Sequence, residues 1–129
     1  MDQTSKKARF AHLNPQFLVA DGEAAVSFYR DKLGFEVEFV LEGPPFFAAM
    51  MRSGLVIYLK QIGQREPGRE FKAAGKHYDV YIFTDDVEAL YREYTDQGVS
   101  ILEPLNTKDY GFTEFLIEDN NGYLLRFGQ

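Results

Sequence analysis

The sequence predicts an α+β fold in which two tandem β-α-β-β-β modules curl into a half-open mixed β-barrel with the helices on the outside. Three observations predict this fold: a strand–helix unit at residues 13–35, a second such unit at residues 77–99, and short alternating strands after each. Each helix is preceded by an aspartate, Asp21 and Asp86, at an offset of 86 − 21 = 65 residues. Because a cap, an apolar helix stripe and a closing glycine recur together, we infer an internal duplication rather than two unrelated strand–helix pairs.

The first module, residues 12–60, begins with a strand that places Phe17 and Val19 on one face. Asp21 is the predicted N-cap, apolar residues follow at helical spacing, and Gly34 supplies the left-handed residue that ends the helix. Three further strands are expected, at residues 35–41, 46–51 and 55–60.

A polar, glycine-containing linker over residues 61–76 separates the modules. In the second module, residues 77–129, we expect a helix at 87–97 and strands at 78–84, 99–102, 112–118 and 123–127. Residues 103–109 are predicted as a loop, because Pro104 stands near their start. Asn121-Gly122 predicts a tight hairpin turn, since both residue types tolerate positive φ.

Composition limits the possible functions. The 129 residues, 45% hydrophobic and 16% aromatic, are enough for one domain, residues 1–129, with its own core. The chain has no cysteine, which excludes thiol chemistry and cysteine metal sites and fits a cytoplasmic protein. A formal net charge of −6 argues against nucleic acid as a partner, and no apolar run is long enough to span a membrane.

The two faces of the predicted sheets differ in character. The helix-facing positions are apolar, whereas the opposite face mixes polar residues with aromatic residues and leucines: Asn14, Gln16, Leu18, Asp79, Tyr81, Phe83, Leu124 and Arg126. A sheet face that only meets solvent would be polar, and the aromatic residues argue against that interpretation. We therefore expect the curled modules to form a mixed cleft that suits a small molecule with rings and polar groups.

Three stretches of the chain carry a family resemblance. They are LVADGEAAVSFYRDKLGFEV (18–37), FTDDVEALYREYTDQGV (83–99) and YGFTEFLIEDNNGYLLRFGQ (110–129). They resemble the two β-α units and the closing hairpin of the vicinal oxygen chelate superfamily, which includes glyoxalase I, extradiol dioxygenases and bleomycin resistance proteins. The superfamily's usual Asp-Pro-x-Gly turn is here Asp119-Asn120-Asn121-Gly122, without the proline. The resemblance implies the paired-module fold but no single activity, because this fold carries several chemistries.

The resemblance also implies four metal-ligand positions, which fall on Asn14, residues 56–58, Asp79 and Arg126. A guanidinium is always positively charged and only donates hydrogen bonds, so Arg126 would repel a metal ion. One carboxylate and one amide are too few to hold a transition metal tightly. We therefore expect no metal cofactor, and we expect Asp79 and Arg126 either to contact a ligand or to pair with each other.

An alternative metal site remains open. His12 and His77 occupy equivalent positions in the repeat, and together with Asp79 they would supply three ligands for a divalent metal ion. Such a site would make the protein a metal-dependent lyase, isomerase or dioxygenase acting on a small carbonyl or aromatic compound. The competing interpretation places both histidines at strand starts, on the surface or at the module interface. Glu114 and Glu118 are likewise either surface residues or a general acid and base.

The preferred hypothesis is a metal-independent binding protein for an antibiotic-like small molecule, similar to the bleomycin resistance branch, which acts by sequestering its ligand. That branch usually forms homodimers with the cleft between modules of two subunits, so the resemblance implies a homodimer, with module exchange as one possibility. A structural or regulatory role without a ligand is a third alternative. The predicted ligand-binding residues are Asn14, Gln16, Tyr58, Asp79, Tyr81, Phe83, Tyr110, Phe112 and Arg126.

Overall fold

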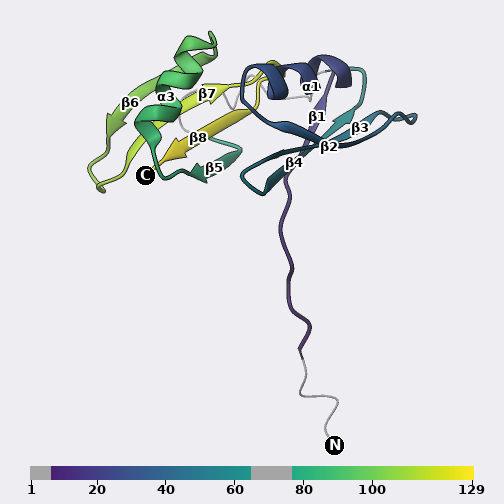
Figure 1. The fold of residues 1–129 in the computed structure, drawn as a ribbon, viewed down its shortest axis with the longest axis horizontal. Helices are drawn as coiled ribbons and strands as arrows, with labels where there is room; N and C mark the ends of the chain where they lie inside the picture. Colours follow the sequence, from purple (N-terminus) through teal and green to yellow (C-terminus); the bar gives the residue numbers. More distant parts are fainter. Residues whose placement is uncertain (1–6, 65–76) are drawn as a thin grey trace, which may run out of the picture.

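The computed structural model describes residues 7–64 and 77–129 and has the predicted order of elements twice over (Figure 1). The first run consists of β1 (Gln16–Val19), α1 (Gly22–Asp31), β2 (Glu36–Leu41), β3 (Phe47–Arg52) and β4 (Leu55–Gln61). The second run consists of β5 (Val80–Phe83), α3 (Val87–Asp96), β6 (Ser100–Thr107), β7 (Thr113–Glu118) and β8 (Leu124–Gly128). The predicted α+β fold of two β-α-β-β-β modules is confirmed.

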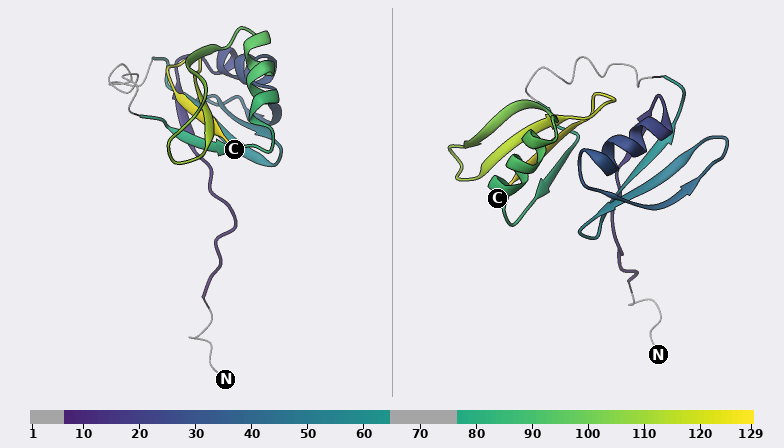
Figure 2. Two further views of the ribbon diagram at one scale, coloured as in Figure 1. Left: turned by 90° about the vertical axis from the view of Figure 1, so that its left-hand side faces the viewer. Right: turned by 45° about the horizontal axis from the view of Figure 1, so that its top comes forward.

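Each module forms its own four-stranded mixed sheet, with the order β1-β4-β3-β2 in the first and β5-β8-β7-β6 in the second. The first strand of each sheet pairs in parallel with the last strand, and the other pairs are antiparallel. Figure 2 shows the modules side by side, with α1 and α3 each packed on its own sheet. The two sheets therefore make an open arrangement rather than a closed barrel.

The helices begin and end as the sequence predicts. Asp21 and Asp86 are the N-caps, and the carboxylate of each accepts the backbone N–H three residues on, at 3.2 and 3.0 Å. Gly34 and Gly98 follow the helices at φ of 78° and 73°, a conformation that costs glycine little. The same short signals thus fix both helices relative to their strands.

The core lies between each sheet and its helix. In the first module, Phe17 and Val19 face Tyr29 of α1, and all three are almost fully buried. In the second module, the rings of Phe115 and Phe127 stack at 5.3 Å and meet Tyr94 of α3 edge-on. Burying each such side chain contributes about 1.5–3 kcal/mol, so the helix-covered faces provide most of the stability.

The predicted hairpin between β7 and β8 is present, but Asn121 differs from its expected conformation. Gly122 has φ of 88°, but among the other described non-glycine residues only Ser53 has positive φ, so Asn121 does not adopt the expected conformation. Instead, Asp119 Oδ1 accepts the N–H groups of Asn121 and Tyr123, at 2.8 and 2.9 Å. Only the expected positive φ of Asn121 was wrong, because Asp119 holds this loop and the loop docks onto the first module.

That docking forms one of two joints between the modules. The ring of Tyr123 stacks on Phe17 with centroids 4.1 Å apart, and its hydroxyl bonds both the N–H and the C=O of Leu18. The hydroxyl of Tyr29, from α1, donates to Asp119 Oδ2 at 2.6 Å. These contacts tie the second module's hairpin to β1 and α1.

The second joint is the counterpart of the first in the repeat. Tyr94, 65 residues after Tyr29, donates its hydroxyl to the carbonyl of Leu33 at 2.9 Å. Arg52, the last residue of β3, forms a bidentate ion pair with Glu93 of α3, at 2.7 and 2.9 Å. The helix of each module therefore contributes a tyrosine that bonds the other module, Tyr29 at the β7–β8 connection and Tyr94 just after α1.

Strand β6 is longer than predicted. Residues 103–107, expected as loop, continue the strand and pair with β7. Pro104 is tolerated because β6 is an edge strand of its sheet. The register shifts on either side of Glu103, between Ile101 and Glu103 and again between Glu103 and Asn106, and such irregularities re-aim side chains.

Most of the predicted linker, 65–76 of 61–76, lies outside the described residues, while Gln61 belongs to β4. Within the described ranges, the helices are all too short or too polar to cross a membrane.

Candidate functional site

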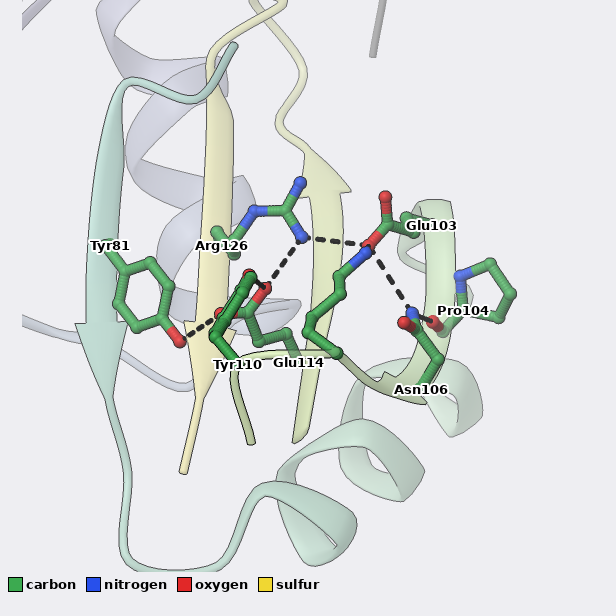
Figure 3. Close-up of polar contacts among 8 residues, drawn as sticks. Tyr81, Glu103, Pro104, Asn106, Tyr110, Glu114 and Arg126 are labelled. Atoms are coloured by element: carbon green, nitrogen blue, oxygen red, sulfur yellow. Dashed lines mark hydrogen bonds and ion pairs between the residues drawn. The ribbon is translucent and has the colours of Figure 1, made fainter. Parts of the chain in front are cut away.

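The face of the second sheet that turns away from α3 carries a connected group of charged and phenolic side chains (Figure 3). Tyr81 comes from β5, Arg126 from β8, Glu114 from β7 and Glu103 from β6, while Tyr110 lies in the connection between β6 and β7. Because side chains alternate along a strand, the neighbours of these residues face the core, and this side of the sheet is left for polar groups.

Arg126 stands at the centre of the group. Its Nη1 bonds Glu103 Oε1 at 2.9 Å and Glu114 Oε1 at 3.2 Å. The Arg126 side chain is 10% exposed and that of Glu114 is 1% exposed. Buried charges of this kind persist only when they are paired and hydrogen-bonded, and here each partner supplies what the other needs.

Glu114 accepts hydrogen bonds from two tyrosine hydroxyls in addition to the one from Arg126. The hydroxyl of Tyr81 donates to Oε2 at 2.6 Å, and that of Tyr110 donates to Oε1 at 2.7 Å. Burial and then this hydrogen bond raise the pKa of Tyr81 well above its ordinary value, and the hydrogen bond to Glu114 raises the pKa of Tyr110. Both phenols therefore stay protonated and serve as donors that hold the carboxylate in place.

Glu103 is the more open of the two carboxylates, with 29% of its side chain exposed. Its Oε1 accepts from Arg126, from Lys108 Nζ and from Asn106 Nδ2. Hydrogen bonds from Arg126 first, and then from Lys108, lower the pKa of Glu103 to about 2. Glu103 thus remains ionised at any physiological pH.

A glycine makes the Tyr81–Glu114 contact possible. A Cβ atom on Gly128 would lie 2.0 Å from the Tyr81 hydroxyl oxygen and 3.2 Å from Glu114 Cγ. Gly128 pairs with Glu114 in the sheet register, so the absent side chain leaves the room that the phenol fills.

The group lies in an open hollow of about 630 Å³ whose other walls are aromatic. Rings follow one another along it: Tyr81 to Phe83 at 4.6 Å, Phe83 to Phe112 at 5.5 Å, and Phe112 to Tyr110 at 5.8 Å. Phe83 and Tyr110 are 63% and 65% exposed, which is unusual for rings of this size. A volume and lining of this kind suit a small molecule.

A second groove, of about 600 Å³, lies where the first sheet meets β5. It includes Asn14, Tyr58 and His12 from the first module and Tyr81 from the second. Asn14 is held by the carbonyl of Val56 at 3.1 Å, and its Oδ1 meets the Tyr58 hydroxyl at 3.4 Å and the His12 ring. Tyr81 is shared by the two hollows.

Of the remaining predicted residues, His77 lines the hollow on the second sheet, whereas Gln16 and Asp79 line neither hollow. Gln16 is exposed beside Tyr58, its partner in the sheet register. Asp79 Oδ2 accepts the N–H of Leu124 at 2.7 Å, and its Oδ1 lies 3.2 Å from His77 Nε2. Asp79 thus anchors the start of β5 to β8, whereas Arg126 takes Glu103 and Glu114 as its carboxylate partners.

Sequence reasoning missed two members of the group and left a third undecided. Glu103 and Lys108 were assigned to a loop, because the irregularities in β6 break the alternation that would have placed Glu103. Glu114, left open between a surface role and acid–base chemistry, is fully buried. Its contact with Arg126 depends on the β7–β8 register, in which Arg126 pairs with Leu116 and Glu114 with Gly128, and the sequence carries no separate signal for it.

The donor set does not fit a divalent metal ion. Across residues 7–64 and 77–129, no three His, Cys, Asp or Glu side chains gather as metal ligands, so His12, His77 and Asp79 do not form a cluster within the chain. At the positions that the family resemblance implies, Arg126 brings a cation that is already bound to two carboxylates. A guanidinium offers no lone pair to a metal.

Paired β-α-β-β-β modules, each with one helix-covered face and one open face, define the class of this fold. The chain belongs to the glyoxalase/bleomycin resistance protein/dioxygenase superfamily, whose family model matches residues 9–127. No curated protein matched the sequence.

Solved structures of the same fold cover nearly the whole chain. TioX from Micromonospora sp. ML1 is 22% identical with a TM-score of 0.74, over 93% of this chain and 98% of that one. UcmS2 is 21% identical with a TM-score of 0.76, over 95% and 98%. A bleomycin-binding protein complexed with bleomycin is 20% identical with a TM-score of 0.73, over 93% and 98%. At these identities the likeness is one of fold.

Proposed function

We propose that this protein binds an antibiotic-like aromatic molecule without a metal ion and acts by sequestering it. The observation that carries the proposal is the hollow on the second sheet, in which exposed rings surround a buried arginine where a metal ligand would stand. Exposed rings offer stacking surface, and a buried ion network offers fixed hydrogen-bonding groups, which together are the usual composition of a ligand pocket.

A bleomycin-binding protein has the same fold, so the fold is compatible with ligand binding. The alternative is a metal-dependent lyase, isomerase or dioxygenase built on His12, His77 and Asp79. A pocket whose carboxylates are taken up by Arg126, Lys108 and two phenols leaves little to coordinate an ion.

We also propose that the protein works as a homodimer in the cytoplasm. Large apolar side chains remain exposed on the open faces of both sheets, including Phe39 at 42% and Phe83 at 63%. Contiguous exposed apolar surface is characteristic of association sites, and a second copy would convert each open face into a cleft. The absence of cysteine from the sequence fits a reducing compartment.

Calorimetric titration with metal-free bleomycin in the presence of EDTA tests the binding function. We expect saturable binding that Phe112→Ser weakens by about tenfold, because a stacking ring is lost. Leu102→Ser is the matched control, since Leu102 is equally exposed, at 41%, but lines neither hollow. Equal losses in both variants would show that the hollow is not the binding surface.

Elemental analysis of the purified protein tests the metal-free part of the proposal. We expect substoichiometric Ni, Zn, Fe and Mn. One equivalent of a metal that disappears in His77→Ala would instead establish the metal-dependent alternative. Sedimentation equilibrium of the same sample measures the oligomeric state. A monomer at all concentrations would contradict the proposed homodimer.

A further inference from the structure

We infer that the hollow on the second sheet recognises a neutral planar molecule by a hydrogen-bond-accepting edge, such as a carboxamide or ring carbonyl oxygen, which Arg126 binds. The inference rests on the proposed binding function and names the chemistry of the ligand.

Arg126 has hydrogen-bond donors to spare inside the hollow. A guanidinium carries five N–H groups, and both carboxylate contacts of Arg126 are made by Nη1. Among the described residues, none accepts a hydrogen bond from Nε or Nη2, although nine-tenths of this side chain is buried. Figure 3 shows the second terminal nitrogen turned away from both glutamates. Buried donors of this kind are completed by an acceptor, and a ligand can supply it.

The same network argues against a charged ligand. Glu103 and Glu114 carry two negative charges in the lining, and Lys108 and Arg126 carry two positive charges. Glu103 accepts its three hydrogen bonds on Oε1, Glu114 accepts three across its two oxygens, and both carboxylates are already ion-paired with Arg126. A cation or an anion would upset the balance, whereas a neutral acceptor would not.

The rings define where the rest of the ligand lies. Tyr81, Phe83 and Phe112 form a continuous aromatic surface beside the arginine. Tyr78 extends that surface on the other side of Tyr81, with ring centroids 5.7 Å apart, and the Arg126 guanidinium stands 5.8 Å from the Tyr78 centroid. A flat molecule stacked on Phe83 and Phe112 would bring one polar edge toward Arg126.

The test uses three probes on one ring system: 2-naphthamide, 2-naphthoate and 2-naphthylmethylammonium. Ligand-observed NMR titration in EDTA measures each dissociation constant, expected on the order of a millimolar for molecules of this size. We expect the amide to bind about fivefold to tenfold more tightly than either ion, because only the amide keeps the buried charges balanced.

Two conservative substitutions of cationic residues then test whether Arg126 is the residue that binds the ligand's acceptor. Arg126→Lys keeps the positive charge between the glutamates but removes the spare N–H groups, and we expect about a tenfold loss of 2-naphthamide affinity. Arg92→Lys is the matched control, since Arg92 is exposed on α3 outside the hollow, and we expect its affinity within about twofold of the parent chain. Unchanged affinity in Arg126→Lys would overturn the inference.

Ranking the affinities of the three probes requires no variant, so this ranking tests the inference even if Arg126→Lys fails to fold. The neutral-ligand inference would be overturned if either the ammonium probe or the naphthoate bound more tightly than the amide, or if all three bound equally. The proposed binding function would then still stand. Failure of all three probes to bind would overturn this inference, whereas the bleomycin titration decides the proposed binding function separately.

Discussion

The open faces of the two modules carry opposite chemistry at equivalent positions. Sheet register relates Tyr58 to Arg126, because each pairs with the first strand of its module, at Gln16 and Tyr81 respectively. The same register makes the aromatic row Phe39, Phe47 and Tyr58 the counterpart of the charged row Glu103, Glu114 and Arg126. In the first module these positions hold aromatic rings with centroids 5.2–6.1 Å apart. In the second module they hold ion pairs with N···O distances of 2.9–3.2 Å.

The comparison separates what the repeat fixes from what it leaves free. Strand pairing, helix caps and joints are duplicated, so the backbone presents the same three positions twice. The side chains at those positions then diverged, and an aromatic row tolerates the loss of one member better than a buried ion network does. The polar specificity of the protein accordingly belongs to the second module.

The largest expected effect comes from removing the centre of the charged row. Glu114→Leu should lower the free energy of unfolding by about 3–5 kcal/mol, because Arg126 loses its buried partner. Phe47→Leu, at the equivalent position, should cost about 1 kcal/mol. Guanidinium denaturation at pH 7 measures both, and losses within about 1 kcal/mol of each other would contradict the distinction between the rows.

The joints give a second, smaller contrast. Tyr29→Phe should lower the free energy of unfolding by about 2 kcal/mol, since its hydroxyl donates to the carboxylate of Asp119. Tyr94→Phe removes a bond to a neutral carbonyl, that of Leu33, and should cost about 1 kcal/mol. The same denaturation assay ranks the pair, and a larger loss in Tyr94→Phe would reverse the assignment of the stronger joint.

Gly128→Ala probes the close approach that only the second module requires. The added Cβ would displace the Tyr81 hydroxyl from Glu114, at a cost of about 1 kcal/mol, and would bring the pKa of Tyr81 down toward its ordinary value. Spectrophotometric tyrosine titration follows that change. Lys60→Ala, at the matching position of the first module, should leave the titration curve unaltered.

The smallest expected effect is a pH dependence confined to the charged row. Glu103 has a pKa of about 2 in the folded protein against an ordinary value of 4.5. Its depressed pKa stabilises the fold fully above pH 4.5, and this contribution is lost as the pH falls from 4.5 toward 2. Melting temperatures across this range should fall more steeply for the parent chain than for Glu103→Gln; parallel curves would mean that Glu103 has no such role.

Much of the fold was predictable because its signals are local. Alternation, the aspartate caps and the closing glycines each act within one or two turns of chain, and their repetition at one offset identified the modules. Within the correctly predicted β7–β8 hairpin, the conformation of Asn121 was predicted wrongly for the opposite reason. Its conformation depends on contacts with Phe17 and Leu18, about a hundred residues away.

The site was predictable only in part, on the same physical grounds. Period-2 alternation places Tyr81, Phe83 and Arg126 on one face, and the structure brings these three to one hollow. Glu103 escaped because register irregularities turn it toward Arg126, and such irregularities have no reliable sequence signature. Whether the predicted residues bind a ligand stays a prediction.

The side-chain N–H of Arg126 offers the most direct test that the charged face of the second module binds ligand without a metal. In ¹⁵N–¹H NMR spectra recorded in EDTA, titration with metal-free bleomycin should shift the Arg126 Nε resonance progressively to saturation. Saturable binding in the calorimeter with no change at Arg126 Nε, and with shifts gathered at Phe39 and Phe47 instead, would place the ligand elsewhere and contradict the assignment.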